Sequence, residues 1–253
     1  MSNGEIPQEY QLEADGSDLM MARARKMLGQ DFLGARAVLQ MGSKLRAVGI
    51  NVEFDVTNNP PLPFSEVDLA LAKENEEMLV LRTAEMKLDG ILMPVSLINF
   101  RELFKKDPRN EGQRLFYFEG SDPNDWYANE TFATSASEIR PGWALVKKEV
   151  LVDSTDKDWN QQDHSLRTYS ESLRRNGGLQ TVARRRTAAE AVWDTMLNYV
   201  NNGKQASDNY DWTQTLASDG RFVYVGEYRS RGLEVNGYAP IYSAPYLGVR
   251  SSR

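Results

Sequence analysis

The stretch from Arg186 to Gly203, RTAAEAVWDTMLNYVNNG, carries the strongest secondary-structure signal in the chain. Thr187 and Glu190 have the spacing of a capping box, in which the Thr hydroxyl accepts from the backbone N–H three residues on and the Glu reaches back to the Thr N–H. Apolar residues then recur at helical spacing, and Gly203 suits the left-handed position that ends a helix. We therefore predict a helix with an apolar face made of Ala189, Val192, Trp193, Met196, Leu197 and Val200.

Before this helix, helical and strand-like patterns alternate without a regular order. The helix signals are an apolar run from residue 19 that Gly29 stops, a second capping box at Ser65 and Asp68, and a run that Ser96 opens. Short strand-like runs occur at residues 78–81, 91–93, 115–118 and 142–146. We therefore predict an α+β chain with a mixed α/β N-terminal region over residues 1–140. Within it, the Pro-rich residues 58–63 should form an extended loop.

The segment from Arg221 to Arg253 has a different pattern. Apolar residues alternate with other types, as expected for short strands with one buried face, at Val223, Val225, Leu233, Val235, Leu247 and Val249. The positions between them are rich in Tyr, Gly, Ser and Asn, a composition typical of antibody recognition loops. Tyr224 is therefore expected to face outward. Residues 208–212 and 218–220 have the composition of turns.

Composition excludes several kinds of chemistry. The chain has no cysteine and one histidine, so disulfides, thiolate nucleophiles, zinc-thiolate sites and His-rich metal sites are all excluded. A net charge of −6 disfavours a nucleic-acid partner, which needs clustered positive charge. No apolar stretch is long enough to span a bilayer, and residues 1–18 do not look like a leader peptide. We therefore expect no membrane partner, and a cytoplasmic location by default.

Three polar groups are weaker candidates for a site. Residues 153–158 carry several oxygen ligands for a cation but lack the glycine and terminal Glu of an EF-hand, so we interpret them as a polar loop. His164 lies next to Asp163, yet no Gly-x-Ser-x-Gly elbow exists for it to serve, which favours a structural role. The basic run at residues 184–186 has the chemistry to contact a phosphate. We expect it instead to flank the helix start and to pair with the acidic N-terminal half.

From Arg186 onward, the order of features resembles the C-type-lectin-like fold shared by two groups of proteins. These are the formylglycine-generating (sulfatase-modifying) enzymes and the variable proteins of diversity-generating retroelements. Arg186–Trp193 is similar to their Arg-x-Pro-Thr-x-x-Glu-x-x-Trp element without the proline, and Tyr210–Trp212 to their Tyr-x-Trp. Arg231–Leu233 stands in the place of a glycine-bearing strand, without Gly-Gly-Ser-Trp. Leu247–Arg250 stands in the place of the closing Gly-Phe-Arg strand, with Val in place of Phe.

The resemblance covers about a quarter of the chain and implies binding rather than catalysis. The sulfatase-modifying enzymes use an active-site cysteine, which this chain lacks. The variable proteins need no catalytic residue, metal or cofactor, and carry diversified positions, rewritten at adenines of the gene, in their last strands and loops. The resemblance thus implies a ligand-binding domain over residues 141–253, with a variable segment at about 221–253, that binds a protein or glycan. Its proposed contacts are Tyr224, Glu227, Tyr228, Arg229, Asn236, Tyr238, Ile241, Tyr242 and Tyr246.

Three alternatives stay open at this point. The chain would be a structural or assembly protein, such as a phage or particle component, if it presented a large apolar interface. It would be an enzyme of unknown class if Asp153, Asp156 and His164 met in a deep pocket. The tyrosines of the tail would be plain sheet residues if they packed against the rest of the fold.

Overall fold

The computed structural model describes residues 19–57, 60–109, 126–135, 138–179, 182–203, 209–229 and 232–253, and at 227–229 it describes the backbone only. Its α-helices are α2 (Leu19–Leu28), α3 (Ala35–Ala47), α4 (Glu66–Glu74), α5 (Leu97–Leu103), α6 (Thr131–Thr134), α7 (Trp159–Arg175) and α8 (Ala188–Asn202). Two 3₁₀ turns are η1 (Gly29–Asp31) and η3 (Val152–Ser154). Helices and strands alternate along the chain, so the α+β class predicted from the sequence is confirmed.

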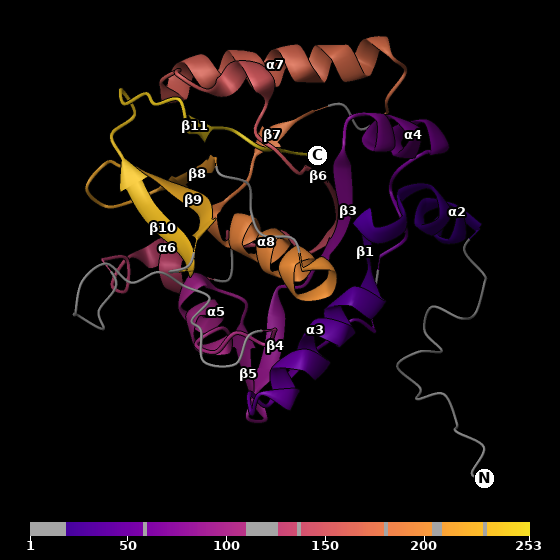
Figure 1. Ribbon diagram of the computed structural model, residues 1–253, viewed down its shortest axis with the longest axis vertical. Coiled ribbons are helices and arrows are strands. Elements are labelled where there is room, and N and C mark those ends of the chain that lie inside the picture. The colour runs from indigo at the N-terminus through magenta and orange to yellow at the C-terminus, as the bar shows by residue number, and fades with distance from the viewer. Residues whose placement is uncertain are drawn as a thin grey trace.

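One sheet draws strands from both halves of the chain (Figure 1). Its order is β1-β3-β6-β12-β7, with bounds Phe32–Leu33, Glu77–Arg82, Gly142–Lys147, Ser251–Ser252 and Arg184–Arg185. β3 pairs with β6 over six residues, and β12 lies between β6 and β7. The boundary predicted between residues 140 and 141 therefore falls inside a sheet, and one hydrophobic core contains residues from both sides of it.

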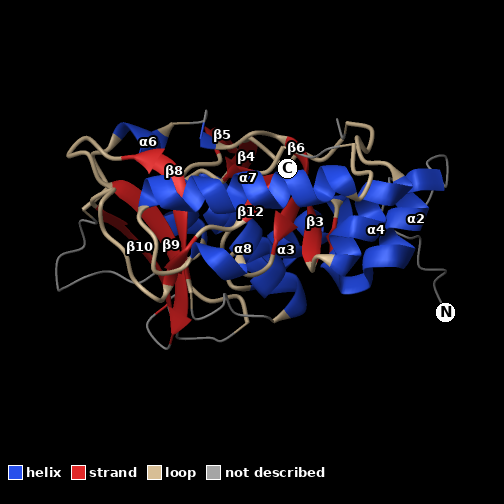
Figure 2. Cartoon of the chain, turned by 90° about the horizontal axis from the view of Figure 1, so that it is seen from above, coloured by secondary structure: helices blue, strands red, loops and turns tan. Residues whose placement is uncertain are grey.

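Two further sheets are formed by the described residues. One has the order β10-β9-β8-β11, with bounds Gly232–Tyr238, Phe222–Arg229, Tyr210–Leu216 and Leu247–Gly248; we call it the C-terminal sheet. The other has the order β2-β4-β5, with bounds Val52–Phe54, Glu85–Leu88 and Ile91–Pro94. α8 lies between the sheets at the centre of the molecule, and α7 crosses over the top (Figures 1 and 2).

The central helix forms as its sequence predicts. Thr187 accepts from the backbone N–H of Glu190, and the Glu190 carboxylate accepts from the backbone N–H of Thr187. Gly203 ends the helix in the left-handed conformation, with φ of 71°. Every residue of the predicted apolar face is buried. The capping box at Ser65 and Asp68 and the cap at Ser96 are likewise present.

Two segments differ from the sequence analysis. Residues 208–212 were predicted as a turn, but Tyr210 starts strand β8, because burial of Tyr210 and Trp212 outweighs the local turn composition. The polar segment after Asp158 forms the 17-residue helix α7, which begins at a capping box of Asp158 and Gln161. The predicted strand at 115–118 lies outside the described residues. No helix in the described ranges is both long enough and apolar enough to cross a bilayer.

Candidate binding surface

The C-terminal sheet has two faces of different chemistry. In its antiparallel register Tyr224 lies opposite Trp212 and Asn236, and Val225 lies opposite Val235. The valine face packs into the main core against α8, and the predicted apolar positions Val223, Val225, Leu233 and Val235 are all buried there. The opposite face carries aromatic and polar residues, which are Tyr210, Trp212, Phe222, Tyr224, Glu234, Asn236 and Tyr238.

Five tyrosines form a closed circuit on and beside this second face, which we call the tyrosine ring. Its members are Tyr210, Tyr224, Tyr238, Tyr242 and Tyr246. The side chain of Tyr224 packs edge-on against Tyr210 and stacks on Tyr238, both at 4.8 Å between ring centroids. Tyr238 stacks on Tyr242 at 4.1 Å. The hydroxyls of Tyr242 and Tyr246 lie 3.0 Å apart, and Tyr246 packs edge-on against Tyr210 at 5.5 Å.

One carboxylate, that of Glu234, lies against two members of the ring, Tyr210 and Tyr224. Glu234 accepts hydrogen bonds from the hydroxyls of Tyr224, at 2.8 Å, and Tyr210, at 3.0 Å. Burial and the neighbouring charge of Glu234 raise the pKa of Tyr224 far above its usual value, so its phenol remains a hydrogen-bond donor. Among the described residues no Lys or Arg pairs with Glu234. Two members of the ring therefore stabilise a half-buried carboxylate through their phenol hydroxyls.

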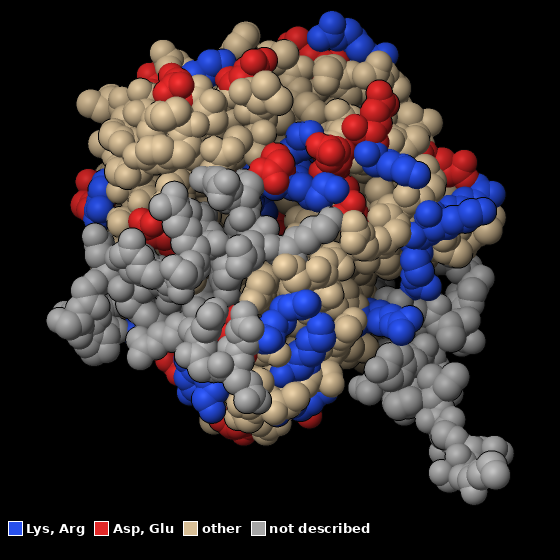
Figure 3. Space-filling model, in the orientation of Figure 1, with Lys and Arg blue, Asp and Glu red and all other residues tan. Residues whose placement is uncertain are grey.

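The ring has a buried half and an exposed half. Tyr224 is only 3% exposed, since Tyr210 and Tyr238 cover it, so the expectation that Tyr224 faces outward as a ligand contact is wrong. Tyr242 and Tyr246 are 36% and 37% exposed. Figure 3 shows a broad area with few charged atoms in this part of the molecule, around the left end of α7 and β11.

The remaining predicted contacts divide into two groups. Asn236 and Tyr238 are half-buried on the tyrosine face, and Ile241 is 85% exposed in the loop that follows. The side chains of Glu227, Tyr228 and Arg229 lie outside the described part of the structure. Sequence reasoning did not include Tyr210 and Glu234 among the contacts. For Glu234 the signal was available, because its even spacing with Asn236 and Tyr238 places all three on one face of a strand.

Helix α7 holds the loop that carries Ile241 and Tyr242. The backbone N–H of Trp159 donates to the Pro240 carbonyl, and that of Asp156 donates to the Ala244 carbonyl. The indole of Trp159 stacks on Phe222 at 4.1 Å between centroids. The start of α7 thereby fixes one side of the exposed half of the ring.

A buried ionic network lies behind the tyrosine face. Asp194 accepts from Arg82 at 2.6 Å and from Arg186 at 2.9 Å, and Asp211 accepts from Arg186 at 2.6 Å. Arg184 donates to Glu190 at 2.6 Å. All three carboxylates are fully buried, so the network links α8 to the sheets on either side of it.

The network corrects one expectation about residues 184–186. Their carboxylate partners were predicted in the acidic N-terminal half, but Asp163, Glu190, Asp194 and Asp211 all come from the second half. The reason is local: α8 starts directly after Arg186, so its first turns present Glu190 and Asp194 to the arginines. The N-terminal half contributes another arginine, Arg82, instead.

The weaker polar candidates do not come together. His164 is exposed on α7, Asp163 pairs with Arg185 at 3.1 Å, and Asp158 caps α7. Asp153 and Asp156 are exposed beside the start of that helix. In the residues that the structure places, no group of three or more His, Asp or Glu side chains is arranged to hold a metal.

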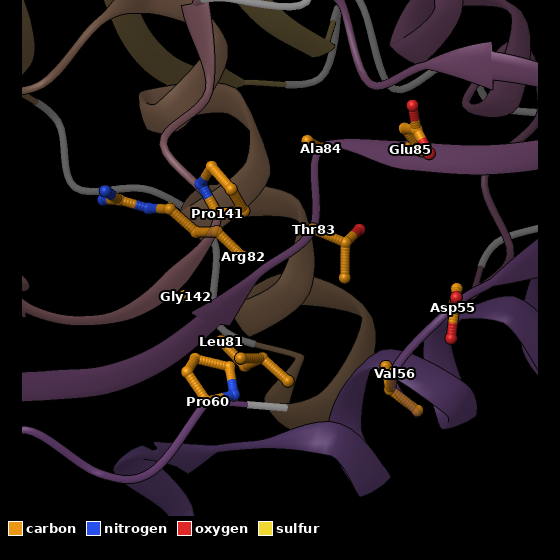
Figure 4. A pocket seen from close by; sticks show the side chains of 10 residues that line it. All are labelled: Asp55, Val56, Pro60, Leu81, Arg82, Thr83, Ala84, Glu85, Pro141 and Gly142. Atoms are coloured by element: carbon orange, nitrogen blue, oxygen red, sulfur yellow. The ribbon is translucent and has the colours of Figure 1, made fainter. Parts of the chain in front are cut away.

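Two cavities lie elsewhere in the molecule. One of about 180 Å³ opens between β3, β4 and the loops at Pro60 and Pro141 (Figure 4). Thr83 lines it, and its buried hydroxyl has no hydrogen-bond partner among the residues that the structure describes. Arg82 also borders this cavity, but its guanidinium points away from Thr83 and is held by the ionic network. The second cavity, of about 210 Å³, lies between α2 and α3. Asp153, Asp156 and His164 line neither of them.

Comparisons with known proteins do not assign a family. No family model, no curated protein and no solved structure matches the chain.

Proposed function

We propose that the chain is a non-enzymatic recognition protein that binds a macromolecular target through the exposed half of the tyrosine ring. The observation that carries this proposal is the contrast between the buried valine face of the C-terminal sheet and the tyrosines of β10 and of the loop that follows it. Val223, Val225, Leu233 and Val235 fix the backbone from behind, while Tyr238, Tyr242 and Tyr246 reach the surface. Rigid, amphipathic tyrosines supply contact area at a low cost in side-chain entropy, and aromatic residues dominate the energetics of interfaces.

The proposal includes a C-type-lectin-like domain of the kind found in retroelement variable proteins. Contacts between the motifs that carry the resemblance support it. Arg186 of the first motif pairs with Asp211 of the second, and the backbone N–H of Arg250 in the last motif donates to the same Asp211 at 2.8 Å. Residues of these separate motifs thus meet in one buried network, which is the behaviour expected of a shared scaffold.

The sequence of the gene and its neighbourhood can test whether the proposed surface is diversified. The neighbourhood of the gene should hold a reverse transcriptase and a near-copy of the 3′ segment, with mismatches at adenines. We expect the mismatches at codons for Asn236, Tyr238, Ile241, Tyr242 and Tyr246, and none at codons for the buried valines. The absence of such a copy, together with no variation at these positions in close relatives, would refute diversification.

Binding itself can be tested on arrays of random peptides and of glycans. The wild-type protein should bind a discrete subset of probes, and the double variant Tyr242→Ala/Tyr246→Ala should lose those signals. The matched control is Leu19→Ala/Val67→Ala, which removes exposed apolar side chains from α2 and α4, outside the C-terminal sheet. Array signals that survive the tyrosine substitutions would rule out the ring as the binding surface.

A second candidate function, a component of a larger assembly, rests on β5. This strand lies at the edge of the β2-β4-β5 sheet, and its residues Ile91 and Leu92 are 66% and 61% exposed. Exposed apolar edge strands pair readily with other chains. If the chain self-assembles through this edge, sedimentation should show oligomers that Ile91→Lys abolishes. A monomer at all concentrations would remove the support that β5 gives to this candidate.

A further inference from the structure

We infer that the tyrosine ring recognises a cationic group, namely a lysine or arginine side chain on a protein target. This inference rests on the proposed function and specifies the chemistry of its ligand. It combines a carboxylate that has no cationic partner among the described residues, the aromatic surface beside it and the charge of the neighbouring segment.

Glu234 is a half-buried carboxylate whose hydrogen-bond donors are phenols. A half-buried carboxylate loses solvation, and it is normally compensated by a cation or by several hydrogen bonds. Here the compensation consists of two phenol donors, from Tyr210 and Tyr224, and within the described residues it includes no cation. An arriving ammonium or guanidinium group would supply the missing positive charge.

The aromatic side chains of the tyrosine ring can also attract a cation. The face of an aromatic ring is electronegative and attracts cations within about 6 Å of its centre, most strongly where water is excluded. The hydroxyl of Tyr224 donates to Glu234, Tyr238 stacks on Tyr224, and Tyr242 stacks on Tyr238 in turn. Tyr246 brings its hydroxyl to within 3.0 Å of that of Tyr242. A long lysine or arginine stem can lie on these rings while its charged end approaches the carboxylate.

The segment over residues 156–159 borders the tyrosine ring. Residues 156–159, which hydrogen-bond to the 240–244 loop, contain Asp156 and Asp158 and one cation, Lys157, whose ammonium lies 3.4 Å from the hydroxyl of Ser165. Arg185 stacks on Trp159 but pairs with Asp163. The described charges beside the ring therefore add to the negative charge of Glu234, which disfavours an acidic ligand.

The experiment measures binding of three soluble probes by isothermal titration: hexalysine, hexaglutamate and maltohexaose. We expect hexalysine to bind the wild-type protein. Glu234→Gln, which keeps the shape and a hydrogen-bond acceptor, should weaken hexalysine binding at least tenfold. Glu102→Gln is the matched control, because it removes the same charge from an exposed position on α5 and should leave binding within twofold. This control separates the site from general attraction to a protein of net charge −6.

A second variant covers the case in which Glu234→Gln lowers the melting temperature. Ile241→Lys places a positive charge at the rim of the ring, at a side chain that is 85% exposed, and should also weaken hexalysine binding without affecting the fold. Equal effects of Glu234→Gln and Glu102→Gln would overturn the inference. So would binding of maltohexaose or hexaglutamate that depends on Tyr242 and Tyr246 but not on Glu234. That last result would leave the proposed function standing, whereas array signals independent of both tyrosines would refute the proposed function itself.

Discussion

Truncating one buried and one exposed member of the tyrosine ring should have very different consequences for stability. Tyr224 is 3% exposed and packs between Tyr210 and Tyr238, whereas Tyr242 is 36% exposed and stacks on Tyr238. A buried aromatic side chain removes about 150–250 Å² from water, and at about 25 cal/mol per Å² this corresponds to about 4–6 kcal/mol as an upper value. Measured losses for buried aromatic-to-alanine changes are about 3–5 kcal/mol.

We therefore expect Tyr224→Ala to lower the free energy of unfolding by about 4 kcal/mol, and Tyr242→Ala by about 1 kcal/mol, the size of one aromatic stacking contact. For a chain of this length the difference corresponds to a gap of about 6–12 °C between the two melting temperatures. Thermal unfolding followed by circular dichroism measures the gap, and chemical denaturation checks it. If the two variants lose the same stability, the division of the ring into a buried and an exposed half is wrong.

Three further predictions concern the frame behind the ring. Asp194→Ala removes the fully buried carboxylate that Arg82 and Arg186 share. We therefore expect urea unfolding to show a free energy of unfolding lower by about 3–5 kcal/mol, and a decrease below about 1 kcal/mol would contradict a stabilising role of the network. Burial pushes the pKa of Glu190 up, but Arg82 and Arg184 outweigh it and hold that pKa at about 2, against an ordinary 4.5. The stability present above pH 4.5 should therefore decline as the pH falls toward 2, and Glu190→Gln should flatten this part of an acid-unfolding curve; an unchanged curve would count against the pairing. Gly226→Ala would place a Cβ 2.8 Å from the Cα of Tyr210. We therefore expect the free energy of unfolding to fall by about 1–3 kcal/mol and the near-ultraviolet circular dichroism of the tyrosines to change. A variant with wild-type values of both would show that strands β8 and β9 can move apart.

Local signals in the sequence were enough to predict the helices that carry their own caps. Thr187 with Glu190 and Ser65 with Asp68 fix helix starts through contacts three residues apart, so no tertiary information is needed. Helix α7 was missed because its residues are mostly polar, although Asp158 and Gln161 form the same kind of cap. The capping box alone predicts the start of this helix, even though the segment after it is polar.

The surface was harder to predict than the frame, since exposure depends on partners distant in sequence. Strand alternation placed Val223 and Val225 inward, and this is confirmed. The same alternation placed Tyr224 on the opposite face but could not show that Tyr210 and Tyr238 would cover it there. The ionic network was equally hidden, because Arg82 is more than a hundred residues from Asp194. Composition indicated tyrosines suited to recognition, and only the fold separates those on the surface from those beneath it.

The position of β12 has a consequence for how variants of this chain would be screened. Ser251 and Ser252 lie at the end of the proposed variable segment, about 221–253, yet they pair with β7 and β6 inside the five-stranded sheet. Arg253 next to them forms buried ion pairs with Glu77 and Asp68. Any frameshift or premature stop in the preceding codons would remove this strand and leave two neighbours without their hydrogen-bonding partner. Chains that lack β12 should therefore be less stable than chains that retain it, whatever side chains their surface carries.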